Sequence, residues 1–179
     1  MPEEDDLTIF AKWWLESRPL NPPFDDNVLM FDGCVMGQTL FREGAFQVQL
    51  FSVKPYTKIA DHTHENVDSY EVYLGGSFEG YKNGENQAPL IGDWLIKTEQ
   101  ITMGGGAVNP LVGRSLRVRP YDSHGGIVGG MGALFLSIQH WKDGVHPSSA
   151  HLDWTFSDSA QRLRNYPLTQ EDVRTKRNE

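Results

Sequence analysis

The sequence lacks several features that define familiar protein classes. Cys34 is the single cysteine among 179 residues, so neither an intrachain disulfide nor a cluster of cysteine ligands can form. We expect Cys34 to be a small buried hydrophobic residue. No apolar run reaches the roughly 18 residues of a membrane-spanning helix, and the first residues are acidic where a secretory signal is basic. These absences predict a cytoplasmic protein in a reducing compartment.

Positive charge is also scarce. The formal net charge is -8 at pH 7, and basic residues gather only between Arg174 and Arg177. Such a chain repels phosphate groups, so we expect neither nucleic acid nor a membrane as a partner. What the chain does have is 39% apolar residues with 18 glycines and 10 prolines. This composition is typical of one loop-rich globular domain.

The N-terminal segment has the pattern of a short helix. Asp5 precedes apolar residues at helical spacing (Phe10, Trp13 and Trp14), and Pro19 prevents the helix from continuing. We interpret the two tryptophans as cover for the core or an interface.

The middle of the chain has the rhythm of a β protein. Alternating or β-branched stretches recur between glycines at short intervals, and Asn83-Gly84 is typical of a two-residue hairpin turn. The clearest predicted strands are 47–53, 68–74, 115–119 and 133–141. Many short antiparallel strands indicate a sandwich or a barrel.

His62 and His64 form the most informative motif. Residues at i and i+2 lie on one face of a β-strand, which suits chelation of a metal. Asp68 follows, and His124 comes after the predicted strand 115–119. Three imidazole nitrogens and one carboxylate oxygen suit Fe(II), Mn(II), Ni(II) or Zn(II). An ordinary solvated strand end is the alternative without a metal.

The same segment resembles the first motif of the cupin superfamily, G-x5-H-x-H-x(3,4)-E-x6-G. His62 and His64 match its histidines, Asp68 stands where the family has Glu, and Gly75 follows at the required interval. Tyr56 replaces the first glycine. This replacement affects a turn and not a metal ligand.

A second motif of that superfamily, G-x5-P-x-G-x2-H-x3-N, is partly matched. Gly113 and His124 have the family's separation, and Pro120 stands one position late. Tyr121 and Val128 replace the second glycine and the closing Asn. The resemblance covers roughly residues 45–142.

The resemblance implies an all-β, single-domain, RmlC-like jelly roll, that is, a double-stranded β-helix barrel. We divide the chain into an N-terminal helix with lead-in strands (1–44), the cupin barrel (45–155) and a polar C-terminal tail (156–179). Thr169 and Asp172 in that tail are typical of a weak capping pair that opens a terminal helix. We also expect a homodimer, because the N-terminal segment offers apolar cover for a sheet edge.

The resemblance implies a metal site made of His62, His64, Asp68 and His124. Glu71 is the alternative carboxylate, and residues three apart on one strand face opposite ways, so only one of the two can point inward. The interval to Gly75 favours Asp68. The remaining histidines match no ligand spacing, and we interpret them as structural or surface residues; they are His140, His146 and His151.

The function that the resemblance favours is an Fe(II)-dependent dioxygenase acting on a small chelating metabolite. Tyr70 is the candidate catalytic residue, because it is expected on the same face of its strand as Asp68. Candidate substrate-binding residues are Arg117, Arg119, Tyr73 and Trp141, and a surface role for the arginines is equally open. One alternative is a non-redox isomerase, epimerase or lyase with Tyr70 or Tyr73 as base. Another is a non-catalytic sugar-binding or small-molecule-binding protein that stacks its ligand on Trp94, Trp141 and Tyr73.

Overall fold

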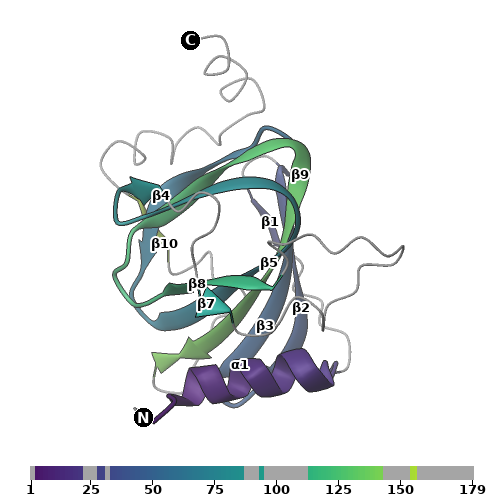
Figure 1. The fold of residues 1–179 in the computed structure, drawn as a ribbon, viewed down its shortest axis with the longest axis vertical. Coiled ribbons are helices and arrows are strands. Elements are labelled where there is room, and N and C mark those ends of the chain that lie inside the picture. Colours follow the sequence, from purple (N-terminus) through teal and green to yellow (C-terminus); the bar gives the residue numbers. More distant parts are fainter. Residues whose placement is uncertain are drawn as a thin grey trace.

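The computed structural model describes residues 3–21, 28–30, 33–86, 93–94, 113–142 and 154–156. One helix, α1 (Asp6–Ser17), packs against strands that curve into a barrel (Figure 1). The strands are β1 (Val28–Met30), β2 (Val35–Glu43), β3 (Phe46–Val53), β4 (Lys58–His64), β5 (Val67–Lys82), β6 (Glu85–Asn86), β7 (Asp93–Trp94), β8 (Arg114–Val118), β9 (His124–Trp141) and β10 (Trp154–Phe156).

Helix α1 begins and ends where the sequence predicts. The Asp5 side chain accepts a hydrogen bond from the Thr8 backbone N–H at 2.9 Å, which caps the first turn. Arg18 adopts a left-handed conformation at the other end. Trp14 is buried in the core, whereas Trp13 keeps 44% of its surface exposed. The predicted helix is therefore confirmed, and the partly exposed Trp13 packs edge-on against the buried Phe41.

The sheet is antiparallel throughout its described pairs. Its main order is β1-β2-β3-β9-β5-β8-β7, with β4 paired to β9 and β10, and β6 paired to β5. The long strand β9 pairs with β3, β4 and β5, so it links the two halves of the barrel. This arrangement confirms the predicted all-β fold class with one N-terminal helix.

Two glycines allow the long strands β5 and β9 to bend around the barrel. Gly76 has φ +95°, and a Cβ there would lie 2.1 Å from the carbonyl oxygen of Gly132, which itself has φ +70°. Any side chain at Gly76 would collide with that backbone. The first half of β9 can therefore pair with β4 while its second half pairs with β3.

The turn after β5 has the predicted form. Lys82 pairs with Glu85, and the two residues between them, Asn83 and Gly84, have φ of +50° and +79°. Positive φ at both positions is the conformation of a type I′ hairpin, which Asn-Gly favours. The predicted hairpin is confirmed.

The two faces of the sheet bury different kinds of residue. The outer face under α1 is apolar and includes Val48, Tyr70, Val72, Leu136 and Ile138 together with residues of the helix. The interior has an apolar part, with Val35, Phe51, Val53, Ile59, Val128 and Ala133. It also has a polar part, with Gln47, Gln49, Ser69, Ser137 and Gln139. Neither face of the central strands is exposed, so polarity does not mark which face points outward.

Some predictions fall outside the described residues. These are the terminal helix at Thr169 and Asp172, most of the tail 156–179, and His146 and His151. The described part contains no helix with the length and apolar character that crossing a membrane requires. Cys34 is buried, as expected.

Candidate metal centre

Three histidines converge inside the barrel. β4 supplies His62 and His64 from alternate positions, and β9 supplies His124, which pairs directly with His62 across the sheet. One potential ligand atom from each residue lies within 4.8 Å of the others. The predicted convergence of residues 62, 64 and 124 is therefore present in the structure.

Backbone carbonyls orient two of these rings. The Nδ1 atom of His62 lies 2.7 Å from the Ala60 carbonyl oxygen, and Nδ1 of His124 lies 3.1 Å from the Asp122 carbonyl oxygen. A carbonyl only accepts, so each Nδ1 carries the proton and each Nε2 keeps its lone pair. This is the tautomer in which a histidine binds a metal through Nε2.

The environment also keeps the rings neutral. Burial lowers the pKa of His62 well below its ordinary value, and repulsion from His124 and His64 lowers it further. Burial and His124 lower the pKa of His64 in the same way, and burial lowers the pKa of His124 to about 4. Neutral imidazoles are the form that binds metal at neutral pH.

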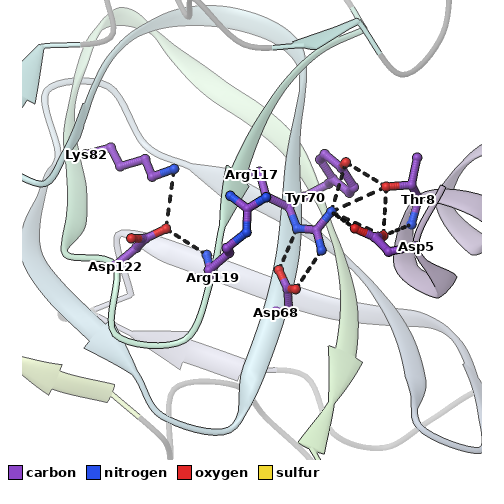
Figure 2. Close-up of polar contacts among 8 residues, drawn as sticks. All are labelled: Asp5, Thr8, Asp68, Tyr70, Lys82, Arg117, Arg119 and Asp122. Carbon is purple, nitrogen blue, oxygen red and sulfur yellow. Dashed lines mark hydrogen bonds and ion pairs between the residues drawn. The ribbon is translucent and has the colours of Figure 1, made fainter. Parts of the chain in front are cut away.

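The loop before His124 is fixed by a small polar network. Lys82 Nζ lies 3.3 Å from the Asp122 carboxylate, which also accepts the Arg119 backbone N–H at 3.0 Å. Figure 2 shows these contacts beside the curving strands. Asn83 donates to the other Asp122 oxygen at 3.1 Å. The residue whose carbonyl orients His124 is thus itself held in place.

The structure does not bring Asp68 to the histidines. Its carboxylate accepts two hydrogen bonds from the Arg117 guanidinium, each of 2.6 Å, and Asp68 is not part of the three-histidine group. Figure 2 shows this pair next to α1. The physical reason is alternation: Asp68 shares its strand face with Tyr70, which packs under the helix.

Tyr70 and Arg117 also lie on the outer face. The Tyr70 hydroxyl is 2.8 Å from Thr8 Oγ1 and accepts a hydrogen bond from Arg117 at 3.0 Å. Arg117 reaches Asp5 at 3.1 Å (Figure 2). Burial alone would lower the pKa of Arg117, but the contacts with Asp68 and Tyr70 outweigh burial and raise it. These residues connect the helix to the sheet instead of facing the interior.

The other predicted substrate residues are divided between surface and interior. Arg119 is exposed. Trp141 is 1% exposed and donates from its indole N–H to Gln139 at 3.0 Å. Tyr73 is buried, and its hydroxyl donates to the Gly76 carbonyl. Of the stacking residues in the binding-protein alternative, the Trp94 side chain lies outside the described residues. His140, as expected, is separate from the group and stacks on Phe46 at 4.5 Å.

The inward-facing carboxyl on β5 belongs to Glu71. Its Oε1 accepts hydrogen bonds from the hydroxyls of Ser69 and Ser137, both at 2.9 Å. Burial raises the pKa of Glu71 to about 7, although these two hydroxyls partly oppose the effect. Glu71, the alternative ligand predicted from the sequence, is likewise not part of the three-histidine group.

A row of interior amides was missed by sequence reasoning. Gln47 and Gln49 on β3 and Gln139 on β9 are each at most 1% exposed and hydrogen-bond to one another. Their period-two spacing was visible in the sequence, but alternating polar residues ordinarily indicate a solvent face.

Comparison with known proteins found similarity only to solved structures, at low sequence identity. No family model and no curated protein matches the chain. Solved structures do match. An RmlC-like cupin from Shewanella frigidimarina is 14% identical over 67% of this chain and 89% of its own, with TM-score 0.46. A double-stranded β-helix protein from Klebsiella pneumoniae is 12% identical over 88% and 99%, with TM-score 0.43. The structure of KdgF from a Halomonas species is 13% identical over 62% and 82%, with TM-score 0.46.

The strand pairing and the three histidines together define an antiparallel β-barrel protein with a candidate metal centre, as the resemblance of the sequence to the cupin motifs implies. The three residues fit a divalent first-row metal, because they offer neutral nitrogen donors from two adjacent strands. Such an ion would supply Lewis acidity or redox chemistry at a site with further coordination positions for substrate.

Proposed function

We propose that this protein is a metal-dependent cupin enzyme that acts on a small chelating metabolite, with an Fe(II)-dependent dioxygenase as the first candidate. One observation carries the proposal: three neutral imidazoles, two of them oriented by backbone carbonyls, meet inside the barrel within 4.8 Å. Mn, Ni or Zn would also suit these donors. The protein's own contribution is to fix the rings and to surround the site with buried side chains.

The donor set favours an anionic substrate. All three protein donors are uncharged, and no carboxylate of the described residues belongs to the group. A divalent ion held there would keep both positive charges, and these would attract a carboxylate or enolate oxygen of the substrate. A chelating organic acid is therefore the substrate class that we propose.

A second candidate function is non-redox catalysis, as in an isomerase, epimerase or lyase. The observation that favours it is Glu71, a carboxyl on the inner face whose pKa of about 7 suits proton transfer at neutral pH. In this version Glu71, and not Tyr70, would move the proton, because the Tyr70 hydroxyl contacts Thr8 on the outer face.

Metal analysis of protein purified without added metal tests these proposals. Stoichiometric iron, together with oxygen uptake when small chelating acids are added, supports the dioxygenase. Zinc, nickel or manganese without oxygen uptake supports the non-redox enzyme. Protein that takes up none of these metals would contradict both candidates and favour a non-catalytic binding protein.

A further inference from the structure

The Glu71 carboxyl is held unequally at its two oxygens. Oε1 accepts both serine hydroxyls, from Ser69 and Ser137. Among the described residues, none makes a hydrogen bond to Oε2. The side chain is half-buried and faces the barrel interior with Gln139 and Ser137. One oxygen therefore anchors the group, whereas the other makes no hydrogen bond to a described residue.

A chain of hydrogen bonds leads from Arg42 to the Glu71 carboxyl, and in each bond the group farther from Glu71 is the donor. Arg42 donates to Gln47 at 2.8 Å, and Gln47 donates to Gln139 at 2.9 Å. Gln139 then donates to Ser137 at 3.0 Å, and Ser137 donates to Glu71 at 2.9 Å. Because every donor in this chain of bonds is oriented the same way, each bond polarises the next and favours negative charge on Glu71.

Burial of the Glu71 carboxyl opposes the effect of these hydrogen bonds on its pKa. Across the sheet Glu71 faces Leu116 of β8 and Ser137 of β9, and neither is charged. By alternation, the titratable or charged groups on the same face are Tyr73, two residues along β5, and Arg114 on β8. Burial raises the pKa of Glu71, the two hydroxyls lower it, and the net value is about 7. The group is thus balanced between two protonation states.

We propose that Glu71 exchanges a proton with a small anionic molecule bound in the barrel interior, with Ser69 and Ser137 as its positioning residues. When the acid form donates, its O–H bond breaks, a new bond forms between the proton and the ligand, and the electron pair stays on the Glu71 carboxylate. The reverse transfer restores the acid, so no oxidant or reductant is needed. The location of the anion rests on the proposed metal function, whereas the behaviour of the carboxyl does not.

The first test measures the carboxyl in metal-free protein. In ¹³C NMR of protein labelled at the Glu side-chain carboxyl, a signal absent from Glu71→Gln should titrate with a midpoint of about 7. Ser137→Ala should move that midpoint upward, because it removes a donor to the ionised form. Ser52→Ala, which removes an exposed hydroxyl on β3, should not move it. A wild-type midpoint below about 5, near that of a free Glu, would overturn the proposal.

The second test measures proton uptake on binding. Calorimetry of zinc-loaded protein with glycolate, a chelating anion ionised throughout, should show uptake of about one proton at pH 8 and almost none at pH 6. Glycolate should bind up to about ten times more weakly at pH 8 than at pH 6. Glu71→Gln should abolish both effects, and Glu43→Gln, at an exposed carboxylate, should abolish neither.

The two proposals fail in different ways. Glycolate binding without proton uptake by the wild type would overturn the role of Glu71 and leave the metal centre intact. Loss of zinc from Glu71→Gln would also overturn it, because Glu71 would then be a metal ligand. A wild-type protein that binds no metal would refute the metal function, and the NMR midpoint would still decide the protonation of Glu71.

Discussion

The two faces of the central sheet solve the problem of buried polar groups differently. On the outer face, Arg117 is paired with Asp68 and Asp5, so its charge is compensated by opposite charges. On the inner face the histidines are neutral, and burial pushes Glu71 toward its neutral form. Full charges are kept where an opposite charge lies within 4 Å, whereas groups without such a partner have a pKa shifted toward the neutral form. The outer face therefore stabilises the fold, whereas the inner face holds the groups that are available for chemistry.

The largest effect should come from the inner face. His62→Ala removes one of three donors, so zinc or iron affinity should fall by at least about 100-fold. His140→Ala is the matched control, because His140 stacks on Phe46 outside the group. Inductively coupled plasma analysis of both variants measures the bound metal. Equal metal content in the two variants would show that His62 does not bind the metal, and the inner face would then differ from the outer face in no such function.

On the outer face, loss of charge compensation should destabilise the fold. Arg117→Met leaves Asp68 and Asp5 without their partner, and because solvent reaches both carboxylates we expect a loss of about 1–3 kcal/mol in the free energy of unfolding. Urea denaturation measures the change. Metal content should stay at the wild-type level, because Arg117 contacts the helix and not the histidines.

The same face provides a direct test of the carboxylate favoured by the sequence motif. Asp68→Asn should lower stability by about 1–2 kcal/mol through its weakened bonds to Arg117. Metal content should not change. A loss of metal in Asp68→Asn with normal unfolding would show that Asp68 binds the ion and that the sequence motif outweighs the observed pairing.

On the inner face, Glu71 should make stability depend on pH. Its folded-state pKa of about 7 lies above the ordinary value of 4.5, so the folded protein binds more protons between these values. The contribution of Glu71 to stability is therefore fully present below about pH 4.5 and is lost as pH rises to 7. Glu71→Gln should gain about 1–3 kcal/mol relative to the wild type at pH 8 and little at pH 5. Urea unfolding at both pH values measures this, and a parallel pH dependence in the two proteins would contradict it.

The smallest effect should come from a pair that belongs to neither face. Lys12 and Glu4 form an ion pair on the exposed side of α1. Glu4→Gln should change the free energy of unfolding by less than about 0.5 kcal/mol, because solvent screens exposed charges. A larger loss in urea denaturation would mean that the helix depends on surface charge as much as on the Arg117 contacts.

Short-range features of the chain were predictable from the sequence. The α1 boundaries follow from Asp5 and Pro19, and the hairpin follows from Asn83-Gly84, because capping and turn chemistry act within a few residues. The sequence favoured Asp68 and Tyr70 as interior residues, whereas the structure places their side chains beside Arg117 and Thr8 on the face under α1. Polar and apolar residues are buried on both faces of β5, so the usual rule that the apolar face is the inner one does not apply. The homodimer and the division at residues 44 and 155 stay predictions.

By itself, the sequence determined the helix, the strand rhythm, and the pairing of His62 with His64 on one face, because these depend only on local backbone geometry. Only the tertiary structure decided which residues face the interior. Residues far apart in the chain fix that choice: α1 covers the face of Asp68, while Ser137 and Gln139 meet Glu71 on the other. A shift of one residue in the alternation of β5 would turn Asp68 inward and Glu71 outward. No local pattern in the sequence determines which of the two alternations occurs.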